Sequence, residues 1–276
     1  MSRVLSRLRA ALLELSPVLR RVAQYVLDNP NAVIYHSVTE FAEATQSSEG
    51  SIIRFCKDMG YSGFQEFKLS LAVELNSVAR PRRESAGADT ELIEAIAESA
   101  GATVQETVAL FEPQAVKEVA TRLLAASRVD IYGVAASGII AQYYAYKLMR
   151  VGITVQAFVD THLATMSASN LKHVDVAIGV SSSGSTLDTL QALTVAREAG
   201  AYTVAITNRL RSPMSRIADQ SLLASPPESP LTGGDIFSKI SQLLILEALI
   251  ETVLSRDDQR RHAVRRTAEV VVEKSV

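Results

Sequence analysis

The sequence predicts an α+α/β protein, in which an all-helical N-terminal domain precedes a C-terminal domain with a doubly wound parallel sheet. Short apolar runs alternate with helical periodicity after residue 128, which is typical of a parallel sheet covered by helices. Residues 1–78 show helical periodicity without such runs. Residues 79–90, ARPRRESAGADT, lack periodicity and are rich in charged and small side chains. We therefore expect domains at 1–78 and 91–276, a linker at 79–90, and the core of the second domain at about 128–224.

The composition is that of a globular protein, and it excludes a membrane-spanning segment. Hydrophobic residues make up 47% of the 276 residues, and the mean hydropathy is +0.14. The longest strongly apolar run, residues 243–250, is interrupted by Glu247 and is far shorter than the ~20 residues that cross a bilayer. The N-terminus alternates arginines with apolar residues and lacks the apolar core of a secretion signal. We expect no membrane partner and a cytoplasmic location.

Cysteine and histidine are too sparse for a disulfide framework or a metal centre. Cys56 is the single cysteine, and the four histidines do not cluster with acids at ligand spacing. Charge is divided unevenly, because residues 1–83 hold 11 Lys and Arg against 8 Asp and Glu, whereas the remainder holds 17 against 22. A mildly basic N-terminal domain favours an anionic partner. The sequence predicts no metal site.

Two short helices joined by a tight turn are predicted in the N-terminal domain. Ser37 and Glu40 have the spacing of a capping box and open a helix at about 38–45. The polar turn Gln46–Ser48 follows. Residues 49–59 then place apolar side chains at i, i+3, i+4 and i+7, with polar and basic ones on the opposite face. This arrangement is typical of a helix-turn-helix motif.

The second of these helices is the candidate DNA-binding element, because the N-terminal residues of such a helix reach base edges in the major groove. The predicted DNA-binding residues are Ser47, Ser48, Gly50, Ser51, Arg54 and Lys57. Lys57 is expected to contact phosphates, as is Lys68 on the next helix. Two alternatives stay open: Arg54 is merely an exposed helix charge, and the two serines 47 and 48 merely cap the helix. Cys56 lies on the apolar face and is interpreted as a core residue.

The C-terminal domain is expected to contain five strands, with helices between the first four. The apolar runs are Val129–Val134, Thr154–Val159, Val176–Val180, Tyr202–Ile206 and Ser221–Ala224. Residues 181–186, SSSGST, follow the third run and precede a helix, and we call them the serine turn. Backbone N–H groups and the helix dipole make such a helix N-terminus favourable for a phosphate, and the hydroxyls add donors. Serine and threonine also cap helices routinely, so capping alone is the alternative.

Two nucleotide-binding motifs are nearly present, and both are incomplete. The loop 133–138, with Asp160 after the next strand, follows a dinucleotide-binding pattern, but Ala135 stands where the middle glycine belongs. Residues 179–186 nearly form a P-loop, but Ser185 stands at the lysine position. The sequence therefore predicts no nucleotide cofactor, and no other cofactor motif is visible.

The N-terminal domain resembles the DNA-binding domain of the RpiR/MurR family of bacterial transcription regulators over about residues 1–78. The resemblance is carried by SEGSIIRFCKDMGYSGFQEFKLSL, with LRRVAQYVLDNP upstream. The family signature is matched by Ser48, Ser51, Ile52, Arg54, Phe55, Lys57, Met59, Gly60, Tyr61, Gly63 and Phe64. This resemblance implies a DNA-binding transcription factor whose partner is double-stranded operator DNA.

The C-terminal domain resembles the sugar isomerase (SIS) domain from about residue 128 to 224, in which a serine of the first loop and an S-x-S-G-x-T turn hold the phosphate of a phosphosugar. The residues that this resemblance implies as phosphate holders are Ser137, Ser181, Ser182, Ser183 and Thr186. His162 follows the second strand, and we interpret it as a partner of a sugar hydroxyl, with a ring-opening base as the alternative. Ser185 stands where the related isomerases have a Glu, and no matching base or lysine is identified in the C-terminal helix.

The two resemblances together imply a transcription regulator of carbohydrate metabolism genes, not an enzyme, whose DNA affinity is controlled by a bound phosphosugar. The alternative is a phosphosugar isomerase with a helical accessory domain. We expect a homodimer or a dimer of dimers. A last long helix is expected at 236–254, capped by Thr232 or Asp235. Its apolar stripe is assigned to Ile240, Leu243, Leu244, Ala248 and Ile250, for core or dimer contacts.

Overall fold

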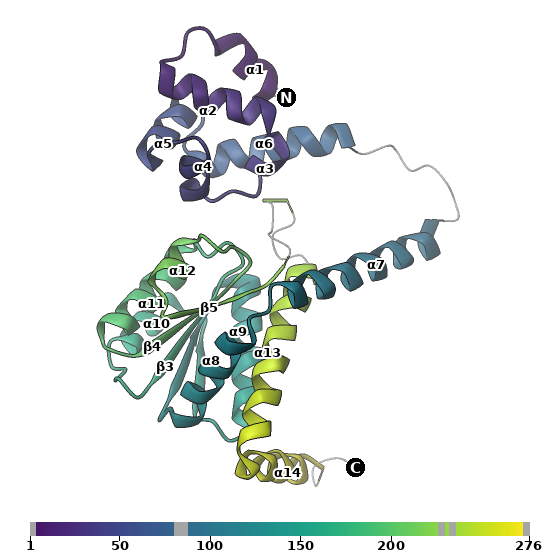
Figure 1. The fold of residues 1–276 in the computed structure, drawn as a ribbon, viewed down its shortest axis with the longest axis vertical. Coiled ribbons are helices and arrows are strands. Elements are labelled where there is room, and N and C mark those ends of the chain that lie inside the picture. Colours follow the sequence, from purple (N-terminus) through teal and green to yellow (C-terminus); the bar gives the residue numbers. More distant parts are fainter. Residues whose placement is uncertain (1–3, 80–87, 226–229, 232–235, 273–276) are drawn as a thin grey trace. The chain divides into compact units, whose positions relative to one another are not determined.

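A computed structural model describes residues 4–79, 88–225, 230–231 and 236–272 of the chain (Figure 1). The chain forms two compact units, one built mainly from residues before 97 and one from residues 97–227 and 234–276. Helix α7 (Ala88–Ala109) spans the boundary between the two units in sequence. Both expected fold classes are present, since the first unit is all-helical and the second contains a parallel sheet.

The N-terminal unit packs its helices around a core of aromatic and aliphatic side chains. Its helices are α1 (Val4–Ala11), α2 (Pro17–Asp28), α3 (Pro30–Val33), α4 (Val38–Ala44), α5 (Glu49–Asp58) and α6 (Phe64–Ala79). Phe41, Phe55 and Phe67 are fully buried at its centre. Phe41 stacks on Phe64 at 5.4 Å between ring centroids, and Phe55 meets Phe67 edge-on at 5.5 Å. These contacts join α4 and α5 to α6.

The predicted helix-turn-helix is confirmed in α4 and α5. The Ser37 side chain accepts a hydrogen bond from the backbone N–H of Glu40, whose carboxylate in turn accepts from the Ser37 N–H at 2.7 Å, which completes the capping box. The turn between the helices contains Gln46 at φ +50°, a left-handed conformation that is costly for a residue other than glycine. Arg21 of α2 donates to the carbonyls of Thr45 and Gln46, each at 2.6 Å, and so holds this turn.

The C-terminal unit contains a five-stranded, all-parallel sheet in the order β2-β1-β3-β4-β5. The strands are β1 (Val129–Tyr132), β2 (Val155–Phe158), β3 (Val176–Val180), β4 (Tyr202–Thr207) and β5 (Gln220–Leu223). All five predicted strands are present, but the second was predicted one residue too long at each end, and the first was predicted two residues too long. It ends at Tyr132 because the chain turns at Gly133 to enter helix α9 at Ala135.

Helices cover both faces of the sheet (Figure 1). The helices of this unit are α8 (Pro113–Ala125), α9 (Ala135–Arg150), α10 (Thr161–Ala168), α11 (Leu187–Glu198), α12 (Pro213–Ile217), α13 (Ile236–Arg256) and α14 (Asp258–Val272). α8, α9 and α13 pack on one face, and α10, α11 and α12 pack on the other. Helix α12 between β4 and β5 was not predicted. It has five residues, too few for a periodic pattern, and Ser212 opens it with a capping box.

The predicted apolar stripe of α13 coincides with the buried face only at Ile250, while Leu243 packs against the core from a half-buried position and Ile240, Leu244 and Ala248 are half-buried. The buried face consists of Ser238, Ser241, Gln242, Ile245, Leu246, Leu249, Ile250 and Val253. Apolar residues surround this helix almost completely, so their spacing does not define which face packs on α8 and α9. The two predicted capping residues, Thr232 and Asp235, lie outside the described residues.

Candidate functional site

The strand order creates a switch point between β1 and β3. These strands are neighbours, with Tyr132 opposite Gly179, yet α9 leaves β1 toward one face and α11 leaves β3 toward the other. In open α/β sheets, ligands bind in the crevice beyond the carboxyl ends of the strands at such a point. The loop after β1 and the serine turn after β3 both begin there. The topology therefore selects these two segments as the candidate ligand site.

Within the serine turn, three hydroxyl groups gather at the N-terminus of α11. Ser181 Oγ lies 3.0 Å from Thr186 Oγ1 and 3.5 Å from Ser183 Oγ, and it accepts from the Gly184 N–H at 3.1 Å. Ser181 and Ser182 are buried, whereas Ser183 is exposed. Thr186 is the N-cap residue of α11, but its side chain makes no capping hydrogen bond. The positive end of the helix thus stands beside a cluster of hydroxyls that point to one another.

The path of the serine turn is fixed by its neighbours. The carbonyl of Ser182 accepts from the backbone N–H of Asn208 at 3.1 Å, and the carbonyl of Gly184 accepts from the N–H of Met214 at 3.0 Å. Gly184 has φ +59°, and a Cβ atom there would lie 2.2 Å from Ser212 Oγ. The turn is therefore held in one conformation before any ligand arrives.

Two polar side chains of α13 reach the serine turn, and sequence reasoning missed both. Lys239 Nζ donates to Ser182 Oγ at 2.9 Å. Gln242 Nε2 donates to the same oxygen at 3.1 Å and to Asn208 Oδ1 at 3.0 Å. The expectation that the C-terminal helix supplies no lysine is wrong. Lys239 brings to the turn the positive charge that the incomplete P-loop lacks at Ser185.

Helix α9 holds Gln242 in place. The hydroxyl of Tyr144, which is fully buried, donates to the backbone carbonyl of Gln242 at 2.5 Å. Burial raises the pKa of the Tyr144 hydroxyl well above its usual value, so it acts as a donor at neutral pH. Gln242 itself is buried, and its Oε1 atom has no hydrogen-bond partner among the described residues. An acceptor without a partner thus lies beside the serine turn.

The other two predicted ligand residues lie at the starts of the helices that follow β1 and β2. Ser137 is half-buried in the first turn of α9, which begins with Ala135 in the left-handed region at φ +51°. His162 is exposed in the first turn of α10, where Asp160 Oδ1 accepts from the Leu163 N–H at 2.9 Å. Within the described residues, no hydrogen bond joins Ser137 or His162 to the serine turn. Their roles in binding stay predictions.

A small cleft lies at the carboxyl edge of the sheet, and none of the predicted ligand residues lines it. Its walls come from the loop after β1, the start of α10 and the first turn of α11: Tyr132, Gly133, Val134, Phe158, Val159, Asp160, Thr161, Ala164, Asp188 and Thr189. The Thr189 hydroxyl is buried without a hydrogen-bond partner among the described residues. The cleft measures about 10 Å³, which suits one water molecule.

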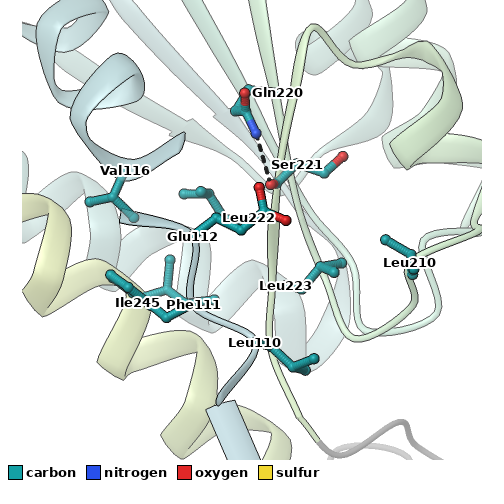
Figure 2. A pocket seen from close by; sticks show the side chains of 10 residues that line it. All are labelled: Leu110, Phe111, Glu112, Val116, Leu210, Gln220, Ser221, Leu222, Leu223 and Ile245. Carbon is teal, nitrogen blue, oxygen red and sulfur yellow. Dashed lines mark hydrogen bonds between the residues drawn. The ribbon is translucent and has the colours of Figure 1, made fainter. Parts of the chain in front are cut away.

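A larger cavity of about 170 Å³ lies elsewhere in this unit, against the edge strand β5 (Figure 2). Side chains from the α7–α8 junction, β5 and α13 converge on it, and most are apolar: Leu110, Phe111, Glu112, Val116, Leu210, Gln220, Ser221, Leu222, Leu223 and Ile245. None of its walls carries a cation, and none of the predicted ligand residues lines it. The serine turn, unlike this cavity, combines hydroxyl groups with a helix N-terminus and a lysine ammonium group.

On the N-terminal unit, two of the predicted DNA-binding residues shape the start of α5, and the other four lie on α5 itself. Ser48 Oγ accepts from the Ser51 N–H at 3.1 Å, and Ser47 Oγ lies 2.9 Å from Thr45 Oγ1, so both serines shape the helix start. The remaining ones, Gly50, Arg54 and Lys57, are exposed, and Ser51 is half-buried. Arg54 Nε is 3.8 Å from the Asp58 carboxylate, a solvent-exposed pair of little energetic weight.

The expectation that Lys68 contacts phosphates is wrong. Its side chain is 7% exposed, and Nζ donates to the backbone carbonyl of His36 at 3.0 Å. A lysine with a buried stem and a bonded ammonium group belongs to the interior of the unit. The interpretation of Cys56 as a core residue is confirmed, because it is fully buried and burial raises the pKa of its thiol to about 12.

Comparisons with known proteins agree with this architecture. A model of the helix-turn-helix domain of the rpiR family matches residues 2–78, and a model of the SIS domain matches residues 122–252. An uncharacterised HTH-type transcriptional regulator of Caldanaerobacter subterraneus is 37% identical over 261 residues, which cover 93% of this chain and 92% of the relative. The chain belongs to the RpiR family of transcriptional regulators.

Two further proteins extend this assignment of the RpiR-family regulator. The structure of Vibrio vulnificus NanR complexed with ManNAc-6P superimposes with a TM-score of 0.91 at 35% identity, covering 99% of this chain and 100% of that chain. The regulator RpiR of Escherichia coli is 28% identical over 236 residues, covering 84% of this chain and 80% of its own. The regulator is thus a DNA-binding transcription factor with a SIS domain.

In the part of the chain that the structure describes, no helix is long and apolar enough to cross a bilayer. Among the same residues, no group of three or more His, Cys, Asp or Glu side chains is arranged to hold a metal ion.

Proposed function

We propose that this regulator binds a phosphosugar at the serine turn and that the bound ligand controls its affinity for operator DNA. The observation that supports the proposal best is the cluster of Ser181, Ser183 and Thr186 hydroxyls at the start of α11, with Lys239 bonded to Ser182 beside it. Hydroxyl donors, a helix N-terminus and an ammonium group together match the charge and oxygen atoms of a phosphate. Operator DNA as the partner also implies action in the bacterial cytoplasm.

The sugar in this proposal is an N-acetylhexosamine 6-phosphate. Support comes from the 35% identity, over 99% of the chain, to a regulator whose structure contains ManNAc-6P. Gln242 Oε1 adds a buried acceptor beside the serine turn, suited to a donor such as a sugar hydroxyl or an amide N–H. Titration calorimetry with N-acetylmannosamine 6-phosphate, glucose 6-phosphate and inorganic phosphate tests this assignment. The first is expected to bind most tightly, and equal affinities would contradict it.

The double variant Ser183→Ala/Thr186→Ala tests the site. Removing two hydroxyls while keeping the helix N–H groups is expected to lower the affinity for N-acetylmannosamine 6-phosphate ~10-fold or more, since each lost bond to a charged group costs about 1.5–3 kcal/mol. Ser255→Ala, at an exposed position of α13, is the matched control. Operator affinity without ligand is expected to stay unchanged. Wild-type ligand binding by the double variant would show that the serine turn only starts a helix.

The regulator is not an isomerase in this proposal. Ser185 provides no carboxylate where the related isomerases have a Glu, and its hydroxyl donates to the Ser183 carbonyl at 3.1 Å. Incubation of the purified protein with hexose and pentose 6-phosphates, followed by chromatography of the sugars, is expected to give no product above the protein-free control. Turnover that disappears in a His162→Asn variant would contradict the proposal and favour the isomerase alternative.

The regulator also acts as a homodimer in this proposal, with two α5 helices in successive major grooves of half-sites ~10 bp apart or a multiple of that. The outer face of α9 carries an exposed apolar stripe that a second copy would cover: Ile139, Tyr143, Tyr146 and Met149. Light scattering during size-exclusion chromatography is expected to give the mass of a dimer for wild type and of a monomer for Tyr146→Glu. A wild-type monomer at micromolar concentration would contradict the proposal.

A further inference from the structure

One side chain on the outer face of α5 is apolar. Ile53 is 41% exposed, whereas its neighbour Ile52 is fully buried in the core. Helical spacing places Ile53 on the same side of α5 as Gly50, Arg54 and Lys57, which are also exposed. A branched apolar group therefore lies among the residues expected to face DNA.

An isoleucine at position 53 does not stabilise the folded domain. A β-branched residue has a lower helix propensity than alanine, and an exposed side chain contributes little burial in return. A single exposed isoleucine on an ordinary surface is unremarkable in proteins. Here it lies on the recognition helix of a DNA-binding transcription factor, between donors and cations that suit base edges and phosphates.

The major groove offers one apolar group for such a side chain to meet. Hydrogen-bond donors and acceptors cover the base edges there, except for the C5-methyl group of thymine. We propose that Ile53 packs against a thymine methyl group in each operator half-site and so selects an A·T pair at that position. The inference rests on the proposed role of α5 as the DNA-binding helix, and it adds a residue that reads sequence without a hydrogen bond.

Gly50 gives this contact room. It precedes Ile53 by three residues on the same face, and a Cβ atom there would have only Ser48 Oγ within 4 Å, at 3.8 Å. Its φ is not in the left-handed region, so backbone conformation does not require glycine there. Because residue 50 has no side chain, a gap lies beside Ile53, and the backbone of α5 can come closer to the base edges in the groove. Arg54 and Lys57 flank this gap and bring the charge that attracts the phosphates.

The experiment is a methyl scan of the operator. Operators are selected from a random double-stranded library, and each thymine of a half-site is then replaced by deoxyuridine, which removes the methyl group alone. Affinities of wild type and Ile53→Ala are measured by fluorescence anisotropy at fixed salt. At one thymine, loss of the methyl group is expected to weaken wild-type binding about fourfold per half-site, the effect of one buried methyl group. Ile53→Ala is expected to bind both operators equally.

Three controls separate this inference from the function on which it rests. Leu69→Ala removes a comparably exposed apolar side chain from α6, 44% exposed, and is expected to keep the wild-type response to the methyl group. Ile53→Ala is expected to keep the wild-type salt dependence, whereas Lys57→Ala lowers the salt slope by about one counterion.

If Arg54→Ala and Lys57→Ala weaken operator binding but no thymine distinguishes wild type from Ile53→Ala, the inference is overturned and α5 stays the DNA-binding helix. If neither cation affects binding, α5 is not the DNA-binding helix. If Ile53→Ala changes the oligomer mass measured by light scattering, and still responds to the thymine methyl group as wild type does, Ile53 contacts another protein chain and the inference is overturned.

Discussion

At the scale of single residues, the serine turn depends on one glycine. Gly184 adopts a left-handed backbone conformation, and a Cβ atom on it would overlap Ser212 Oγ and approach Thr207 Oγ1 to 2.8 Å. Neither neighbour can move easily, because Ser212 is the buried N-cap of α12 and Thr207 ends β4 in the interior. Any larger residue at 184 therefore shifts the hydroxyl cluster.

Gly184→Ala is expected to lower the free energy of unfolding by at least about 2 kcal/mol, since left-handed backbone costs about 1–2 kcal/mol and overpacking about 1–3 kcal/mol. It is also expected to abolish phosphosugar binding. Urea denaturation and calorimetry measure the two effects. Gly101→Ala is the control in the same unit, because Gly101 lies in α7 with nothing within 4 Å of an added Cβ, and alanine favours a helix. Unchanged stability of Gly184→Ala would show that the turn can relax.

At the scale of elements, the start of the recognition helix is held from outside it. The guanidinium group of Arg21 in α2 spans the carbonyls of Thr45 and Gln46, in the turn that joins α4 to α5. Planar guanidinium donors can bind two such oxygens at once, whereas the single ammonium group of lysine binds one in this geometry. The entry angle of α5, and with it the reach of its first residues, thus depends on α2.

Arg21→Lys is expected to weaken operator binding about threefold to tenfold, because one of two hydrogen bonds worth about 0.5–1.5 kcal/mol each is lost at the turn. Fluorescence anisotropy measures the affinity, and thermal unfolding measures stability. Arg20→Lys serves as the comparison, since Arg20 bonds the carbonyls of Leu12, Leu13 and Leu15, away from α5. Both variants are expected to lose similar stability, but only Arg21→Lys to lose DNA affinity. Equal affinities of the two variants would remove Arg21 from the positioning of α5.

At the scale of the whole molecule, the two binding functions lie in different compact units of one chain. A ligand shifts DNA affinity only by the difference between its own affinities for the DNA-competent and the incompetent arrangement. The coupling free energy is typically ~1–3 kcal/mol, and it acts equally in both directions.

Saturating N-acetylmannosamine 6-phosphate is therefore expected to change operator affinity ~5–150-fold, and saturating operator to change the sugar's affinity by the same factor. Anisotropy gives the first factor and calorimetry the second. The double variant Ser183→Ala/Thr186→Ala is expected to show no response at ligand concentrations that saturate wild type. Identical operator affinity of wild type with and without the sugar would contradict regulation by this ligand.

Much of the site could be predicted because its residues are contiguous in sequence. Ser181, Ser183 and Thr186 lie within six residues between a buried strand and a helix, so topology alone brings them together. Lys239 could not be assigned in this way, since it lies 57 residues beyond Ser182 and comes from a helix with apolar residues on nearly every face. The signal available was the polar group Ser238, Lys239, Ser241 and Gln242 at the start of that helix.

Periodicity was sufficient to predict a helix that has one apolar face. It was not sufficient to predict the place of a side chain that is buried by contacts with a distant part of the chain. α4 and α5 have clear faces and caps, so their prediction is confirmed. The charge of Lys68 on α6 favoured a place at the surface, but its ammonium group donates a hydrogen bond to the carbonyl of His36 inside the unit. Only the folded chain places that carbonyl within reach.

The switch point between β1 and β3 divides the candidate site into two parts, the serine turn after β3 and the segments that follow β1 and β2. A substitution in one part need not disturb the other. The hydroxyls proposed to hold the phosphate belong to one short turn whose path is fixed by Gly184, so a substitution that moves the turn moves all of them together. Ser137 and His162 lie in the first turns of α9 and α10, which follow two other strands, and neither supports that turn through a hydrogen bond within the described residues. Under the proposed function, substitutions in these segments can change which sugar is bound without moving the hydroxyls that are proposed to hold its phosphate. A lineage of such regulators can thus acquire new effectors one loop at a time.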